Sequence, residues 1–356
     1  MSKTLISNNF DNKPKYFAVS HTKLLFFNIF YKNNKIYLIM PIYNEPENPN
    51  NIHVTINNNI LPLTEKYIKD SNEPILIYIY EYINHTNSII KVNVKLCNRM
   101  VNSYELRHIH TNFRSISYNN KEIKTNNNFL ALTTLFKNDY YLFPLFYNYY
   151  KFQGVDHFYM YYNGIITEDI KKIFNKSDVT LIQWGFHYWN PPGTKYPHHA
   201  QMGQMHDALY KYGKDNYDYM IFCDLDEYLH IPNEKFIDID NENNNAKNIS
   251  RFIKNNPDID IFGFCNYWAN TIDDDIPSTN ELPNKFLAVK EPTEYLERSK
   301  NIYKVSSINT IGIHQIGYNF YNEKKAITDL KMYHFYKWSS KKRNIENCIY
   351  EVDLTN

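Results

Sequence analysis

Strand-length and helix-length segments alternate from Phe129 onward, and this alternation constrains the fold more than any other feature of the chain. Apolar runs of strand length predict strands at Phe129–Phe136, Asp156–Tyr162, Val179–Trp184 and Tyr219–Cys223. The segments between them predict helices at Tyr140–Phe152, Glu168–Phe174 and His199–Tyr212. This pattern is typical of an α/β fold, in which helices cover both faces of a mostly parallel sheet.

The first third of the chain has a different pattern. Short β-branched and aromatic runs predict strands at Tyr16–Val19, Lys23–Tyr31, Lys35–Ile39, Ile52–Ile56, Ile75–Ile79 and Ile89–Leu96. Their spacing favours a sandwich or small barrel, and the Asn-rich stretch 118–128 is typical of a linker. We therefore expect an independent, β-rich, sandwich-like accessory domain at 1–125 and a second, α/β domain at 126–356. Exposed Tyr and Phe rings on the accessory domain would offer flat apolar faces to a ligand, or the same rings could fill its core.

Composition argues against several classes of partner. The formal net charge is +1, which gives no reason to expect a nucleic acid or an anionic membrane. We see no signal peptide and no apolar run of about eighteen residues, so no transmembrane segment is expected. The four cysteines lack metal-ligand spacing and suit reduced thiols in a cytoplasmic protein. If the Asn- and Lys-rich composition reflects a viral genome, that location is the host cytoplasm.

The predicted strand Tyr219–Cys223 ends directly in the acidic sequence Asp224-Leu225-Asp226-Glu227. Ligands of open α/β sheets bind at the carboxyl ends of strands. Residues two apart on an extended chain point the same way, so Asp224 and Asp226 can share a ligand. Three carboxylates this close repel one another unless a cation or hydrogen-bond donors compensate. A hard divalent cation that bridges a diphosphate would meet this need, and the alternative is a simple acidic turn.

The segment Cys223–Leu229 resembles the DxDEF/Y signature of glycosyltransferase family 92 and its relatives, which share the GT-A fold. Further segments resemble elements of that family in the same order: Gln153–Tyr161, Gln204–Leu209, Arg298–Lys304, Gly312–His314 and His334–Ser339. The resemblance covers Phe129 to Ser339. His206 stands where Asn is usual and Phe335 where Tyr is usual, and neither departure removes a carboxylate.

The resemblance implies a GT-A-type, Rossmann-like nucleotide-sugar domain preceded by the β-sandwich-like domain. It also implies Mn²⁺ or Mg²⁺ as cofactor and a UDP-hexose as donor. A glycan or protein-linked acceptor would receive the sugar, with inversion of the anomeric centre. The partners expected are therefore the nucleotide sugar and a glycan or glycoprotein acceptor.

The resemblance also suggests roles for individual residues near the metal. Asp226 would be a direct metal ligand, and Asp224 would reach the metal through water or would contact the donor ribose. His334 would complete the metal shell, with His314 as the alternative histidine. Glu227 could instead hold the turn or a neighbouring lysine. Lys337 could meet a phosphate or be a solvated surface charge.

Polar residues at other strand ends are candidates for donor and acceptor contacts. The expected donor contacts are Thr133, Asp139, Asn163 and Gln204. An inverting transfer needs a general base, for which Asp274 is the candidate. The neighbouring Asp273 and Asp275, together with Glu294 and Glu297, are alternatives. Trp268 could stack on an acceptor ring or belong to the core.

Two other functions stay open at this point. In a DxD phosphohydrolase Asp224 would be the nucleophile, and the protein would cleave p-nitrophenyl phosphate. In a non-catalytic glycan-binding pseudoenzyme the β-rich module would bind sugar, and no Mn²⁺-dependent donor hydrolysis would occur.

Overall fold

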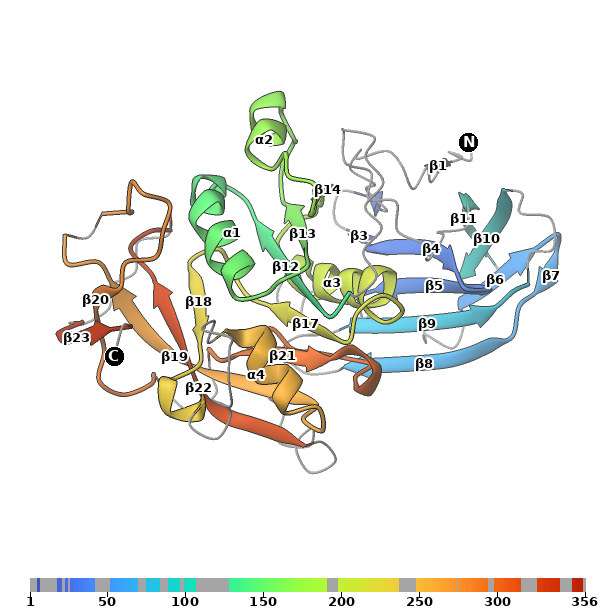
Figure 1. Ribbon diagram of the computed structural model, residues 1–356. Coiled ribbons are helices and arrows are strands. Elements are labelled where there is room, and N and C mark those ends of the chain that lie inside the picture. The colour runs from blue at the N-terminus through green and yellow to red at the C-terminus, as the bar shows by residue number, and fades with distance from the viewer. Residues whose placement is uncertain are drawn as a thin grey trace.

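Figure 1 shows the computed structural model of the chain. The structure describes residues 5–6, 18–20, 23–24, 26–41, 52–69, 75–83, 89–96, 99–106, 128–190, 198–236, 248–273, 275–293, 298–314, 325–339 and 348–354.

A ten-stranded mixed sheet is the centre of the C-terminal two thirds. Its strand order is β14-β13-β12-β17-β21-β19-β20-β23, and β22 joins β18 to β19. The strands are β12 (Leu130–Phe136), β13 (His157–Tyr162), β14 (Val179–Gln183), β17 (Tyr219–Phe222), β18 (Glu227–His230), β19 (Ile261–Asn270), β20 (Lys285–Ala288), β21 (Lys300–Lys304), β22 (Ala326–Phe335) and β23 (Tyr350–Asp353). A short hairpin is formed by β15 (Trp189–Asn190) and β16 (His198–His199).

The expectation of a mostly parallel sheet is correct for only part of this sheet. Strands β14, β13, β12 and β17 are parallel, as the strand–helix alternation predicts. Beyond β17, every pairing except β19 with β22 is antiparallel. Antiparallel strands need no crossover helix, and the later strands have few helices between them. The fold is therefore α/β with a large mixed sheet.

Helices cover both faces of the parallel strands. On β13, Phe158 and Met160 pack in one apolar cluster with α1 (Phe143–Phe152), α2 (Glu168–Ile173) and α4 (Ile249–Asn255). Tyr159 and Tyr161 point to the other face, into a cluster with α3 (Ala200–Asp207) and the π-helical turn η3 (Ala208–Gly213). Short 3-10 turns are η2 (Tyr140–Leu142), η4 (Asn233–Phe236) and η5 (Val305–Ser307). No helix in the described ranges is long and apolar enough to cross a membrane.

The N-terminal strands form two larger sheets and a short hairpin. A four-stranded sheet has the order β4-β5-β9-β8, and a five-stranded sheet has the order β1-β11-β10-β6-β7. The strands are β1 (Leu5–Ile6), β2 (Ala18–Ser20), β3 (Lys23–Leu24), β4 (Asn28–Lys32), β5 (Lys35–Met40), β6 (Ile52–Ile56), β7 (Asn59–Ile60), β8 (Leu63–Lys69), β9 (Ile75–Glu81), β10 (Ile90–Leu96) and β11 (Arg99–Leu106). Strand β6 has the predicted bounds, whereas β8 and β11 were not predicted because polar residues interrupt their apolar pattern. The sandwich topology itself stays a prediction.

Strands β4, β5 and β9 of the four-stranded sheet are buried on both faces, whereas the edge strand β8 is partly exposed. All five residues of β4 are buried, although period-two alternation would expose every second one in a sheet with one wet face. Tyr37 lies on the same face of the sheet as its cross-strand partner Phe30. There it packs near Tyr210 of η3, with ring centroids 5.9 Å apart. One continuous apolar cluster includes residues of both N-terminal sheets and of α3 and η3. The two predicted domains thus share a core, and the boundary near residue 125 stays a prediction because 107–127 lie outside the described residues.

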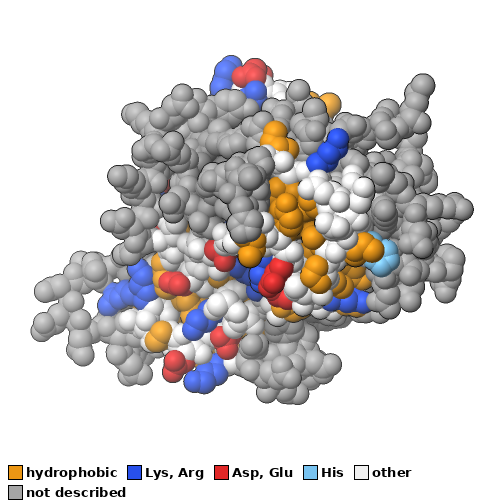
Figure 2. Space-filling model, turned by 90° about the vertical axis from the view of Figure 1, so that its right-hand side faces the viewer, with side chains coloured by type: hydrophobic (Ala, Val, Ile, Leu, Met, Phe, Trp, Pro, Cys, Tyr) orange, Lys and Arg blue, Asp and Glu red, His pale blue; other side chains and the backbone are white. Residues whose placement is uncertain are grey.

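Aromatic side chains of the N-terminal strands fill this core. The described Tyr and Phe residues of this part are buried or half-buried. Figure 2 views the molecule from this side and shows apolar side chains on its described surface. The exposed large apolar residues in the described N-terminal part are aliphatic: Ile60, Leu63, Ile68, Ile83 and Ile89. In the described part of this module, the sequence alternative in which aromatics fill the core is the one observed, and binding of acceptor by the module stays a prediction.

Gly203 on α3 provides a test of the contact between the two parts. A Cβ atom at this position would lie 2.3 Å from Cγ of the buried Phe27 ring. Gly203→Ala gains about 1 kcal/mol of helix propensity but overpacks the contact at a cost of about 1–3 kcal/mol. We expect net destabilisation, measured as a lower urea midpoint at unchanged m value.

Gly213→Ala at the end of η3 is the matched control. Its Cβ would lie 3.3 Å from the flexible Met220 thioether sulfur, which can move aside, so stability should be unchanged or higher. A Gly203→Ala protein at least as stable as the wild type would show that the Phe27 ring does not press on α3.

Candidate active site

The acidic sequence after β17 forms a tight turn that Glu227 holds closed. The backbone N–H of Asp224 donates to Glu227 Oε2 at 2.7 Å, and the N–H of Glu227 donates to the carbonyl of Asp224 at 3.2 Å. Glu227 is 1% exposed and starts β18, so the turn links two strands of the sheet. The geometry agrees with the structural role that the sequence left open for Glu227.

A buried lysine compensates the clustered carboxylates. The Lys300 ammonium lies 2.9 Å from Asp224 Oδ2 and 3.3 Å from Glu227 Oε2. Lys300 is 2% exposed and comes from β21, which pairs with β17. Burial alone would lower the pKa of Lys300, but the two carboxylates raise it above its ordinary value. Burial and the neighbouring Asp224 raise the pKa of Glu227 to about 7 although Lys300 opposes them. For Asp224, burial favours a higher pKa and Lys300 outweighs it, so the pKa is lowered.

Asp226 faces His334 across the pairing of β18 with β22. His334 is opposite Glu227 in this register, and its Nε2 lies 3.2 Å from Asp226 Oδ2. Both side chains are buried, and the Trp268 ring packs against the imidazole with centroids 4.6 Å apart. The Arg298 guanidinium lies over the Trp268 ring, 5.4 Å from its centroid. Trp268 is therefore a wall of the site rather than an exposed platform.

The three predicted metal ligands are only partly brought together. Asp226 and His334 converge, and two ligands of one octahedral ion lie about 3 Å apart, so this pair fits Mn²⁺ or Mg²⁺. The Asp224 carboxylate is instead held by Lys300 and by Gln201 Nε2, which donates to Oδ1 at 3.0 Å. No group of three or more His, Cys, Asp or Glu within the described ranges is arranged to hold a metal. An ion on Asp226 and His334 would thus take its remaining ligands from water and phosphate oxygens.

His314, the alternative histidine, lies near the same carboxylates. Its Nδ1 is buried with no hydrogen-bond partner among the described residues, and its carbonyl accepts from Ser299 Oγ at 2.6 Å. Burial and the neighbouring Lys300 lower the pKa of His314 to about 3, so the ring is neutral. A neutral imidazole can bind a metal, but in the described part of the chain it is His334, not His314, that contacts a carboxylate of the acidic turn.

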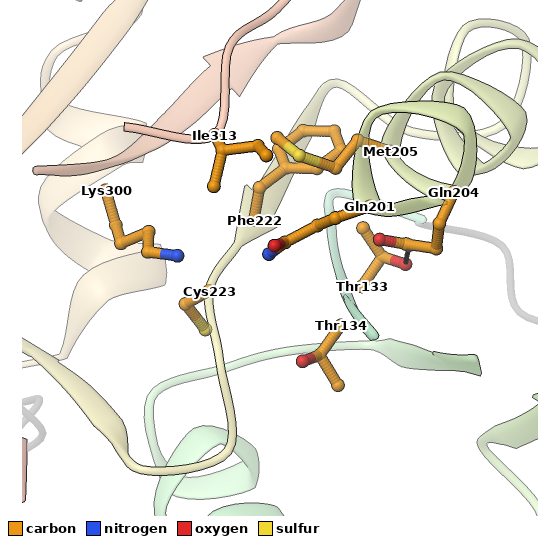
Figure 3. A pocket seen from close by; sticks show the side chains of 9 residues that line it. All are labelled: Thr133, Thr134, Gln201, Gln204, Met205, Phe222, Cys223, Lys300 and Ile313. Carbon is orange, nitrogen blue, oxygen red and sulfur yellow. Dashed lines mark hydrogen bonds between the residues drawn. The ribbon is translucent and has the colours of Figure 1, made fainter. Parts of the chain in front are cut away.

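A small pocket beside these residues includes two of the side chains expected to meet the donor, Thr133 and Gln204. It is lined by Thr133, Thr134, Gln201, Gln204, Met205, Phe222, Cys223, Lys300 and Ile313. Figure 3 shows the Lys300 ammonium and the Gln201 amide pointing toward one another. Gln204 Nε2 donates to Thr133 Oγ1 at 2.7 Å, which joins α3 to the middle of β12.

The remaining candidates follow strands of the sheet without lining this pocket, or they lie outside the described residues. Asp139 follows β12, where the Tyr141 hydroxyl lies 3.3 Å from its carboxylate and also donates to the Trp338 carbonyl. Lys337 is exposed and lies next to Trp338 in the turn after β22. Asn163 is half-buried at the end of β13, and its N–H donates to Phe136. Asp274, Glu294 and Glu297 are not among the described residues.

Sequence reasoning missed three residues of this site: Gln201, Arg298 and Lys300. Lys300 had a usable signal, because three adjacent carboxylates need a compensating cation and a lysine starts an apolar strand there. Arg298 lies two residues earlier in the same segment. Gln201 lies one helical turn before Gln204, and the sequence pattern there is typical of a solvent-exposed helix face. Only the tertiary structure brings its side chain to Asp224.

Removal of the Lys300 charge should destabilise the protein strongly. Lys300→Met leaves two carboxylates buried without their cation, and loss of one partner of a buried pair costs about 3–5 kcal/mol. Urea unfolding followed by circular dichroism measures this loss.

Lys304→Met is the control on the same strand. Its ammonium contacts the Pro257 carbonyl in an exposed position, so the free energy of unfolding should change by less than about 0.5 kcal/mol. Equal effects of the two variants would refute the role given to Lys300.

Comparison with known proteins addresses the function of this site. No curated protein matches the chain. A family model described as glycosyltransferase family 92 matches residues 131–353, which include β12, the acidic turn, Lys300 and His334. This match supports transfer of a sugar over the phosphohydrolase alternative, and it covers more than half of the sequence. The chain belongs to glycosyltransferase family 92 and is a glycosyltransferase.

Proposed function

We propose that the protein transfers a hexose from a UDP-sugar to a glycan or protein-linked acceptor and that the reaction requires Mn²⁺ or Mg²⁺. The observation that carries the proposal is the Asp226–His334 pair, with Asp226 Oδ2 and His334 Nε2 3.2 Å apart at the end of the acidic turn. Carboxylate and imidazole together form an acceptable donor set for Mn²⁺. When bound, the ion would neutralise the diphosphate that leaves with the nucleoside.

Residues of the chain itself surround the proposed diphosphate position with charge. Asp224 keeps about a third of its side chain exposed although each oxygen already accepts one hydrogen bond. A carboxylate oxygen has further lone pairs, so Asp224 can accept from a ribose hydroxyl or from metal-bound water. Arg298 is half-buried against Trp268 and offers donors that match phosphate geometry. Lys337 offers a second, exposed cation.

The nucleoside is proposed to bind at the edge of the sheet beside this pocket, which is too small to hold a nucleoside itself. Thr133 and Gln204 hold each other there, and Thr133 Oγ1 also donates to the Tyr159 carbonyl. Ligands of α/β sheets bind at this edge, beyond the carboxyl ends of the parallel strands. Asp139 and Asn163 follow two of these strands and are proposed as further donor contacts.

The proposed reaction inverts the configuration of the anomeric centre, as the family resemblance implies, and it therefore needs a general base. Asp274 remains the proposed base: it follows β19, whose Trp268 is paired with His334. The end of β19 therefore lies at the same edge as the proposed metal ligands. Proton NMR of the anomeric centre in the first product tests inversion, and retention would contradict it.

Asp226→Asn should abolish metal-dependent binding of UDP without unfolding the protein. The amide keeps the volume of the side chain but removes the negative charge that binds the cation. Calorimetric titration of UDP in the presence of Mn²⁺ should show binding to the wild type and none to the variant. Asp329→Asn on β22 is the matched control because Asp329 is exposed and pairs with Lys235. Unchanged affinity in the Asp226 variant would contradict the proposed metal site.

His334→Ala should weaken Mn²⁺ binding by about 10-fold or more, which is about 1.4 kcal/mol per decade. His314→Ala should have a smaller effect because it is His334, and not His314, whose ring nitrogen lies beside the Asp226 carboxylate. Both affinities can be measured by Mn²⁺ paramagnetic resonance, which counts the free ion. The reverse ranking would place the metal at His314.

A further inference from the structure

Helix α3 lies between the donor pocket and the N-terminal sheet, and all eight of its residues are buried. Toward the site, Gln201 donates to Asp224 and Gln204 donates to Thr133. Toward the N-terminal part, Gly203 meets Phe27, the residue before β4, and Asp207 meets Asn28 of β4. Figure 1 shows α3 at the end of the four-stranded sheet, between that sheet and β12.

Phe27 fixes the first turn of α3. Its ring packs where Gly203 has no side chain, and it stacks on Trp184 with centroids 6.2 Å apart. Trp184 Nε1 in turn donates to the carbonyl of Ala200, the first residue of the helix, at 2.9 Å. The ring and the indole therefore limit movement of α3 along and across its axis.

Asn28 fixes the last turn of α3 through a buried carboxylate. Its amide donates to Asp207 Oδ1 at 2.6 Å, and the Tyr161 hydroxyl donates to Asp207 Oδ2 at 2.7 Å. Asn28, Asp207 and Tyr161 are all buried. A buried carboxylate that loses one donor is left partly unsatisfied, so this contact strongly favours one helix position.

Lys32 fixes the π-helical turn that follows. Its ammonium is 0% exposed and donates to the carbonyls of Tyr210 and Lys211 at 3.2 and 2.9 Å. It also pairs with Asp215 at 2.7 Å. A buried cation must keep its partners, so η3 cannot shift without breaking contacts to β4.

We propose that β4 and Phe27 complete the donor site by setting the position of α3, and that Asn28 is a positioning residue for donor binding. The proposal rests on the proposed function, since it takes Asp224 and Thr133 as parts of that donor site. A helix moves as a rigid rod, so a displacement at Asp207 reaches Gln204 and Gln201, which are one and two turns away. A shift of about 1 Å lengthens hydrogen bonds of 2.7 and 3.0 Å beyond the useful range.

The test exchanges the two members of the Asn28–Asp207 pair in the full chain. Asn28→Asp places two carboxylates at this buried contact and should weaken UDP binding with Mn²⁺ by about 10-fold, or 1.4 kcal/mol. The double variant Asn28→Asp, Asp207→Asn restores a donor facing an acceptor and should recover affinity to within about threefold of wild type. Asn28 and Asp207 do not belong to the pocket, so rescue by exchange would not follow from a direct contact with the ligand.

Val92→Ala is the control for general instability. Val92 is fully buried on β10 in the five-stranded sheet, and its truncation should lower stability while leaving UDP affinity unchanged. Equal loss of affinity in Val92→Ala and Asn28→Asp would overturn the positioning role. So would an Asn28→Asp protein with wild-type affinity, or a double variant that is not rescued.

Amide hydrogen exchange separates this proposal from the proposed function. Without any ligand, residues 200–213 should exchange faster in Asn28→Asp, and β22 should not. If the wild type fails to bind UDP with Mn²⁺, the proposed function fails, while exchange still reports whether β4 holds α3. Unchanged exchange in 200–213 would overturn the inference whatever the result with UDP.

Discussion

The buried ammonium of Lys300 is the interaction on which the rest of the site depends. Three carboxylates in four residues cannot be buried together without a compensating charge. Lys300 supplies that charge to Asp224 and Glu227, and Glu227 in turn holds the turn between β17 and β18 closed. Asp226 instead faces His334 of β22. These different surroundings support the different roles proposed for Asp224 and Asp226.

The position of α3 is the second constraint, and it couples the N-terminal part of the chain to the site. The helix reaches Asp224 and Thr133 with two glutamines. Phe27 and Asn28 contact α3 from the N-terminal part, and Lys32 holds the π-helical turn that follows it. Because one apolar cluster runs through this contact, the β-rich module is joined to the catalytic part by its core. A module of this kind can matter for donor binding without contacting the donor.

The sequence predicted those features that depend on local pattern. The buried run before Asp224 predicted β17. The family resemblance suggested His334 as a metal ligand, and its ring lies 3.2 Å from Asp226, while its role with a metal stays a prediction. Antiparallel pairing beyond β17 was not predictable from strand–helix alternation. Lys300 and Gln201 reach Asp224 across 76 and 23 residues, and Asn28 reaches Asp207 across 179. Such contacts depend on how elements pack, and no local periodicity reports that packing.

A crystal structure of the full chain with UDP and Mn²⁺, with the ion located by its anomalous scattering, is the most direct test of the proposed metal site. We expect Mn²⁺ bound to Asp226 and His334 and to diphosphate oxygens, while the Asp224 carboxylate still accepts from Lys300 and Gln201. A manganese ion held directly by Asp224 with Lys300 displaced, or an ion bound away from His334, would contradict this expectation.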